Sequence, residues 1–280
     1  SSGMIRLGLV FMWSALITAL VAYLTRALIT QQINLEAVGI FGAAFSLSAM
    51  FVGFVLGAMG ADYYPRLTAV ASDRAAVNRL VNEQTEIGLL LAVPGLLATL
   101  SLAPWIIRIF YTDAFLPAAE LLQWFVLGCL GRVISWPLGF VMLALGKGRW
   151  FFATETTFSL LHLALIALGL FVLGIEGVAV AFFVLYIACT LGVYWVAHRL
   201  TDFCWSPAAR RLLLWLLPIV VVAFLAARLL PLWPATVFGG VATMVASVLC
   251  LRGLVQRIGT GHRIVQMACR VPGMRLACGL

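Results

Sequence analysis

One arginine stands alone in an apolar stretch of the sequence. Arg132 lies 12 residues after Glu120 and 14 residues before Gly146, and its neighbours are mostly Leu, Gly, Val and Ile. A guanidinium stays charged at any physiological pH and binds phosphate or carboxylate groups through two parallel hydrogen bonds. Arg132 therefore predicts a binding group for an anion such as a lipid diphosphate or an acidic sugar. The alternative is a structural role, in an ion pair or against backbone carbonyl groups of a neighbouring helix.

The next apolar stretch carries three polar side chains at helical spacing. Glu155, Ser159 and His162 stand at positions i, i+4 and i+7, which share one face of a helix. A buried glutamate and a histidine can both exchange protons near neutral pH. We therefore expect Glu155 to contribute to substrate binding and all three residues to serve proton or cation coupling. Hydrogen bonds between helices, worth roughly 0.6 kcal/mol each, explain the same stripe, and for His162 alone we prefer that structural role.

A second arginine lies close to the end of the first apolar stretch. Arg26 follows Tyr23 by three residues. Its long side chain can reach the membrane interface beside this tyrosine, or it can face the same polar cavity as Arg132 and bind substrate there. The sequence leaves both positions open.

The elements that position these residues must be membrane-spanning helices. The chain has 280 residues, of which 64% are hydrophobic and 10% charged, and its mean hydropathy is +1.11, which excludes a soluble domain. Apolar runs of about 20 residues, the length that crosses a bilayer as a helix, recur throughout. This pattern predicts an all-α, polytopic membrane protein with eight spans, at residues 7–29, 38–60, 87–110, 120–145, 150–173, 177–199, 210–230 and 235–251.

Basic residues predict the orientation of these spans. Apart from Arg132, fourteen Lys and Arg residues fall on the side of both termini and three on the opposite side. Positively charged loops stay in the cytoplasm, so both termini are expected there. The net charge of +8 is thereby explained by topology, and nucleic-acid binding is not expected.

Two local features suggest how the second span ends. Asp62, Tyr63, Tyr64 and Pro65 follow one another, which is typical of a membrane–water boundary with interfacial aromatic residues. Asp73 can then cap a short amphipathic helix lying on the membrane surface.

The sequence lacks the patterns that indicate disulfides, metal sites or ATP hydrolysis. None of the six cysteines falls in a predicted outer loop, so no disulfide is expected. No Cys/His spacing suggests a metal, and no Gly-rich loop with a lysine suggests ATP hydrolysis. We therefore expect no catalytic residue, cofactor or metal, and no enzymatic activity.

Three stretches resemble a known family. They are GIFGAAFSLSAMFVGFVLGAMGADYYPRL at 39–67, MWSALITALVAYLTRALI at 12–29 and GFVMLALGKGRWFF at 139–152. Together they resemble the C-terminal half of bacterial O-antigen flippases, the Wzx-type polysaccharide transporters. That family belongs to the multidrug/oligosaccharidyl-lipid/polysaccharide (MOP) superfamily, which also holds the MATE drug exporters and the lipid II flippase.

The resemblance implies a domain organisation. Residues 1–200 would form the second six-helix lobe, family helices 7–12, facing an N-terminal lobe that this sequence does not contain. Residues 201–251 would add two helices, and 252–280 would form a basic cytoplasmic tail. By the same resemblance, Arg26, Arg132 and Glu155 fall on helices that line the central cavity.

The resemblance also implies a function. The protein would move undecaprenyl-diphosphate-linked O-antigen or related repeat units from the cytoplasmic to the periplasmic leaflet of the bacterial inner membrane, by alternating access of two lobes. Its partners would be this lipid-linked oligosaccharide, membrane lipids, the N-terminal lobe and a polysaccharide polymerase complex. Two alternatives stay open: a MATE-like cation-coupled multidrug exporter, and a membrane assembly partner that transports nothing.

Overall fold

The protein folds into a bundle of long helices. The structure, a computed structural model, describes residues 2–258. Within this range it contains α-helices and one 3₁₀ turn but no strand, and eight of the helices are long and apolar enough to cross a membrane. The predicted all-α class and the predicted number of spans are confirmed. The elements are α1 (Ser2–Gln32), α2 (Leu35–Ala69), α3 (Arg74–Ser101), α4 (Ala103–Phe110), the turn Asp113–Phe115, α5 (Ala118–Ala144), α6 (Gly148–Leu173), α7 (Ile175–Thr201), α8 (Pro207–Leu229) and α9 (Leu232–Ile258).

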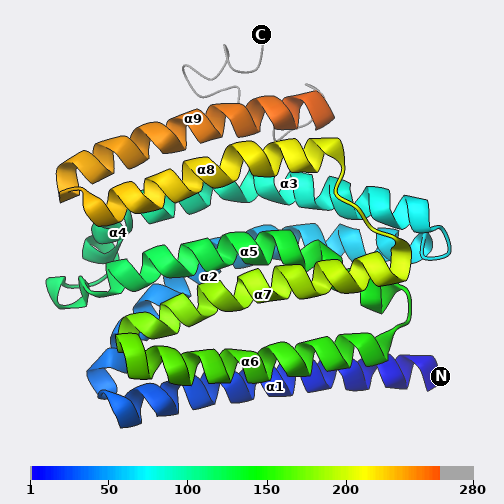
Figure 1. Cartoon of the computed structure of the whole chain (residues 1–280), viewed down its shortest axis with the longest axis horizontal. Coiled ribbons are helices and arrows are strands. Elements are labelled where there is room, and N and C mark those ends of the chain that lie inside the picture. The colour runs from blue at the N-terminus through cyan, green and yellow to red at the C-terminus, as the bar shows by residue number, and fades with distance from the viewer. Residues whose placement is uncertain (1, 259–280) are drawn as a thin grey trace.

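The long helices run alongside one another with their axes nearly aligned (Figure 1). Helices α1 and α6 pair on one side of the bundle, and α3, α8 and α9 pack together on the other. Helices α2, α5 and α7 lie between these two groups. The start of α1 and the end of α9 lie at the same end of the bundle, as an even number of crossings requires (Figure 1).

Helix α7 separates two helices that are neighbours in sequence. It packs along both α5 and α6, which hardly touch each other (Figure 1). Two glycines of α5 allow the close approach, because a Cβ on Gly128 would overlap the ring of Phe182 and a Cβ on Gly131 would come within 2.9 Å of Tyr186. Small residues at helix contacts are the usual device for close packing in membranes.

Aromatic rings fill the centre of the bundle. The ring centroids of Phe45 and Phe125 are 5.5 Å apart and those of Phe125 and Phe182 are 5.3 Å apart, both in edge-to-face geometry. Phe41 joins this cluster at 5.9 Å from Phe125. The cluster connects α2, α5 and α7, so the three central helices share one apolar core.

The predicted surface helix after Asp73 is not a separate element. Asp73 does cap a helix, since its carboxylate accepts hydrogen bonds from the backbone of Ala75 and Ala76 at 2.9 and 3.2 Å. That helix is α3, which continues without a break to Ser101, and its residues Val77 and Val81 are fully buried. The prediction was wrong because protein, not lipid, covers the apolar face.

The helix of the second span is longer than the expected span 38–60. Helix α2 continues through Pro65 to Ala69. Tyr63 is buried, and its hydroxyl donates a hydrogen bond to the carbonyl of Pro137 at 2.9 Å. Tyr63 therefore takes part in a contact between α2 and α5, and the membrane boundary beside it stays a prediction.

Two other boundaries differ from those expected. The third span ends at Ser101, and the residues beyond it form the separate helix α4 with Pro104 in its first turn, where the missing N–H costs no hydrogen bond. The last span continues past residue 251 to Ile258. The basic tail expected at 252–280 otherwise lies outside the described residues.

Candidate functional site

Arg132 lies at the middle of the central helix α5. It is 14 residues from Ala118 and 12 from Ala144, or about 20 Å from either end of the helix. Its side chain is half-buried. Within residues 2–258 no carboxylate lies at ion-pair distance from its guanidinium, and no side-chain hydrogen bond is made to it. A permanent charge at this depth is therefore left for a ligand or water.

The surroundings of Arg132 come from α5 and α7. Gly131, its neighbour in the sequence, packs against Tyr186 of α7. Thr190 adds a hydroxyl on the same face of α7, where it donates to the carbonyls of Gly131 and Tyr186 at 3.3 and 2.7 Å. Polar groups thus gather beside the arginine without neutralising it.

Glu155 lies at the contact between α6 and α1. The hydroxyl of Ser14 donates a hydrogen bond to its carboxylate at 3.2 Å, and Trp13 donates to the neighbouring Thr156 at 3.1 Å. Glu155 therefore contacts α1, whereas Arg132 lies on α5.

The remaining residues of the predicted stripe have fewer partners. The ring of His162 packs 6.1 Å from the ring of Phe182, and the described residues give neither His162 nor Ser159 a side-chain hydrogen bond. The stripe does not meet Arg132 directly, because Phe182 and Tyr186 of α7 lie in the way.

Arg26 is not part of this group. It is exposed on α1, and its guanidinium donates to the carbonyl of Ala22 in its own helix at 2.9 Å. Ser14, which meets Glu155, is 12 residues earlier on α1, or about 18 Å away along the helix. The structure thus places Arg132 at the middle of α5, Glu155 at the contact of α6 with α1, and Arg26 apart from both.

Sequence reasoning missed a charged cluster at the end of the bundle where α1 begins. Glu86 of α3 is 3% exposed, forms an ion pair with Arg257 of α9, and accepts a hydrogen bond of 2.6 Å from Ser206 at the start of α8. Asn82 adds a hydrogen bond to the carbonyl of Cys204 at 3.1 Å. The sequence places Glu86 in the loop before the third predicted span and Arg257 in the tail after the last one, and only their location on the same side of the membrane suggests the pairing.

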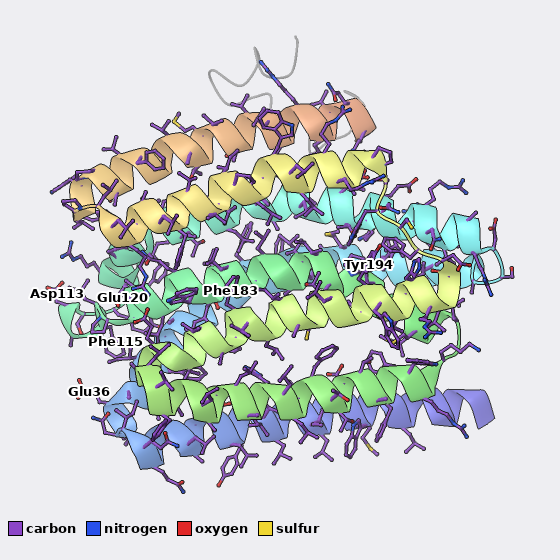
Figure 2. The ribbon with its side chains drawn as sticks, in the orientation of Figure 1. Glu36, Asp113, Phe115, Glu120, Phe183 and Tyr194 are labelled. Atoms are coloured by element: carbon purple, nitrogen blue, oxygen red, sulfur yellow. The ribbon has the colours of Figure 1, made fainter. Side chains whose placement is uncertain are left out.

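A second missed cluster lies at the opposite end, where Figure 2 shows Glu120. Arg228 of α8 forms ion pairs with Glu120 of α5, at 3.1 Å, and with Glu176 of α7. Its guanidinium also lies over the rings of Trp124 and Phe224, at 5.7 and 5.8 Å from their centroids. Trp124 completes the cluster by donating to Glu176 at 2.8 Å. The two clusters fasten α8 and α9 to the rest of the bundle.

Comparisons with known proteins agree with this architecture. Residues 1–120 match the family model described as polysaccharide biosynthesis protein. No curated protein matches the sequence significantly.

Solved structures show the fold. The chain is similar to the inward closed conformation of the lipid II flippase MurJ, with a TM-score of 0.59 and 16% identity over 84% of this chain and 52% of that one. A MOP superfamily transporter from Pyrococcus furiosus gives a TM-score of 0.60 and 14% identity over 90% of this chain and 63% of that one. An outward-facing multidrug resistance MATE family transporter gives a TM-score of 0.58 and 14% identity over 99% of this chain and 76% of that one. The chain thus spans about half to three quarters of the length of these structures.

The chain thus has the fold of these transporter structures, and its first 120 residues match the family model of polysaccharide biosynthesis proteins.

Proposed function

We propose that this chain is part of a flippase that moves undecaprenyl-diphosphate-linked O-antigen or related polysaccharide repeat units across the bacterial inner membrane. The observation that carries the proposal is Arg132, a charge at mid-membrane depth without a counter-ion among the described residues. Keeping such a residue costs about 2.5 kcal/mol or more, so a functional role is the default. The match of residues 1–120 to polysaccharide biosynthesis proteins supports a glycan as the cargo.

The chemistry of the cargo fits this site. A sugar diphosphate cannot enter hydrocarbon unaided, because its polar groups would lose their hydrogen bonds to water. Arg132 can bind one phosphate through two parallel hydrogen bonds. Two negative charges moving outward across a 100 mV inside-negative potential release roughly 4.6 kcal/mol, which drives transport without ATP.

The surface of α2 supports a two-lobe arrangement. At Gly53 and Gly57, which predict a close helix contact, a Cβ would have no neighbouring atom within 4 Å among the described residues. Phe54 between them is 76% exposed. We propose that this face, with the exposed side of α1, meets the N-terminal lobe expected from the family, and that Arg26 faces the cavity between the lobes. Alternating access would then move the lobes about this contact.

Complementation of a strain that lacks the complete gene tests the proposal. The protein carrying Arg132→Ala should insert normally but fail to restore surface polysaccharide, and undecaprenyl-linked glycans should accumulate in the inner membrane. Arg132→Lys should restore export only in part, because an ammonium cannot form the two parallel hydrogen bonds. The matched control is Arg79→Ala, which removes an exposed positive charge at the end of the bundle and should leave export intact. Normal export with Arg132→Ala would refute the assigned role.

The half-buried carboxylate of Glu155 favours a second candidate, a cation-coupled exporter like the MATE transporters of the same fold. An exporter of cationic drugs needs an acidic cavity, and deletion of its gene would raise drug sensitivity without changing lipid-linked glycans. In that case Glu155→Gln would abolish activity and Arg132→Ala would not. An assembly partner without transport activity would tolerate both substitutions.

A further inference from the structure

A groove of about 260 Å³ opens between α6 and α7 at the end of the bundle where α1 begins. Trp150, Ala153, Thr157 and Phe158 of α6 line one wall, and Gly192 with Trp195 of α7 forms the other. A Cβ on Gly192 would overlap the ring of Phe158, so the glycine allows that ring to form the floor.

The inside of the groove is apolar. The hydroxyl of Thr154 is used within its own helix, where it donates to the carbonyls of Trp150 and Phe151 at 2.9 Å each. From Trp150 to Phe158 the groove covers eight residues, or about 12 Å of helix, which is most of the ~15 Å that one leaflet contributes to a ~30 Å hydrocarbon core. These dimensions suit a lipid acyl chain lying along the helices.

Three basic residues adjoin the end of the groove at Trp150 and Trp195, which we call its mouth: two lie within three residues of Trp150 in the sequence, and one contacts Trp195. Lys147 and Arg149, at the start of α6, are exposed. Arg199 of α7 is also exposed, with its guanidinium 5.4 Å from the centroid of Trp195. Within the described residues, none of the three forms an ion pair with a carboxylate, and the nearby Asp202 is taken by Arg74 at 2.9 Å. Three such cations around the mouth complement a phosphate.

The two tryptophans set the depth of this mouth. The rings of Trp150 and Trp195 lie 5.9 Å apart and are 38% and 51% exposed. Tryptophan is enriched at the level of lipid headgroups, so the basic residues beside the rings fall where a phosphodiester would lie.

We propose that this groove is a binding site for one anionic phospholipid, with an acyl chain between α6 and α7 and the phosphate among Lys147, Arg149 and Arg199. Its position on α6 and α7 is separate from Arg132 on α5, and the inference does not rest on the cargo proposed above. A lipid held here would brace α6, which has little protein contact on its outer face.

Native mass spectrometry of the purified chain in detergent, titrated with palmitoyl-oleoyl phosphatidylglycerol or phosphatidylcholine, tests the site. We expect one phosphatidylglycerol to stay bound at concentrations where phosphatidylcholine does not. The double variant Arg149→Gln/Arg199→Gln should weaken this binding about tenfold or more. Thr157→Trp, which fills the groove and keeps all charges, should weaken it as strongly.

The matched control is Arg210→Gln/Arg211→Gln, which removes two exposed arginines from the start of α8, outside the groove. Its affinity should stay within about twofold of the unaltered chain, as for a change away from the site. An equal loss in this control, or equal binding of phosphatidylcholine, would overturn the proposal in favour of general surface electrostatics. Tighter binding of undecaprenyl phosphate would instead identify the site as one for the carrier lipid. Binding of glycerol phosphate as tight as that of phosphatidylglycerol would exclude a role for the groove.

Discussion

Arg228 and Arg132 both place a positive charge among apolar helices, but the groups that surround the two charges differ. Arg228 lies near a helix end and has two carboxylate partners and two aromatic rings around it. Arg132 lies at the centre of α5 and has none of these within the described residues. The arginine whose position costs more free energy is therefore the one that has no carboxylate or aromatic partner among the described residues.

This contrast separates two purposes. A charge that fastens helices is expected to be surrounded by opposite charges, as Arg228 and Arg257 are. A charge that binds a passing ligand must stay available, because a permanent partner would compete with that ligand. This distinction predicts that substitution of Arg228 or Arg257 lowers the free energy of unfolding strongly. Substitution of Arg132 should change it little.

The largest loss of stability is expected for Arg257→Gln. The substitution leaves the Glu86 carboxylate, only 4% exposed, without its counter-ion, and breaking a buried pair costs about 3 to 5 kcal/mol. Chemical denaturation in detergent micelles measures the free energy of unfolding. The control Arg252→Gln removes an exposed charge little more than one turn earlier on α9 and should cost under about 0.5 kcal/mol. Equal effects of the two would show that Glu86 finds another partner.

A smaller loss is expected for Arg228→Gln. The substitution removes two ion pairs and the contact with Trp124, yet both glutamates can still reach water, so we expect about 2 kcal/mol. The same denaturation experiment measures it. Arg108→Gln is the matched control, because its pair with Asp113 is mostly exposed and should be worth under about 1 kcal/mol.

The two partners of Arg228 should differ in the same experiment. Glu176 is 33% exposed in its side chain and also accepts from Trp124, whereas the side chain of Glu120 is 61% exposed. We expect Glu176→Gln to lower the free energy of unfolding by about 1 kcal/mol and Glu120→Gln by about 0.3 kcal/mol. The reverse order would place the main contact of Arg228 on α5.

The smallest effect on stability is expected for Arg132→Leu. Arg132 lies at the middle of α5 and has no carboxylate partner among the described residues, so removing its charge should leave the free energy of unfolding unchanged or raise it by about 1 kcal/mol. The complementation assay should nevertheless report a loss of export. A fall in stability of more than about 1 kcal/mol would assign Arg132 a structural role instead.

Much of the fold follows from local properties of the sequence. Hydropathy alone locates the eight spans, and Asp73 marks the start of α3 because capping depends only on adjacent backbone groups. Arg132 is recognisable for the same reason, since a charge within an apolar run is unusual wherever the helix packs.

The partners across the bundle could not be predicted in this way. A helical stripe such as Glu155 and His162 shows which face is polar but not which helix covers it, and here the covering residues include Ser14 and Phe182 from distant segments. Glu86 and Arg257 lie far apart along the chain, so no local signal joins them. Tyr63 illustrates the same limit, because a tyrosine at a span end is equally typical of an interface and of a buried contact.

The position of α7 between α5 and α6 has a consequence for biogenesis. The chain emerges in sequence order, so α5 and α6 enter the membrane before the helix that packs against both of them exists. Until Ile175–Thr201 is synthesised, the glycine face of α5 at Gly128 and Gly131 lacks the partner that it has in the folded chain. The insertion of α7 is therefore the step that joins α6 to α5, and it also brings Tyr186 against Gly131, next to Arg132 in the sequence.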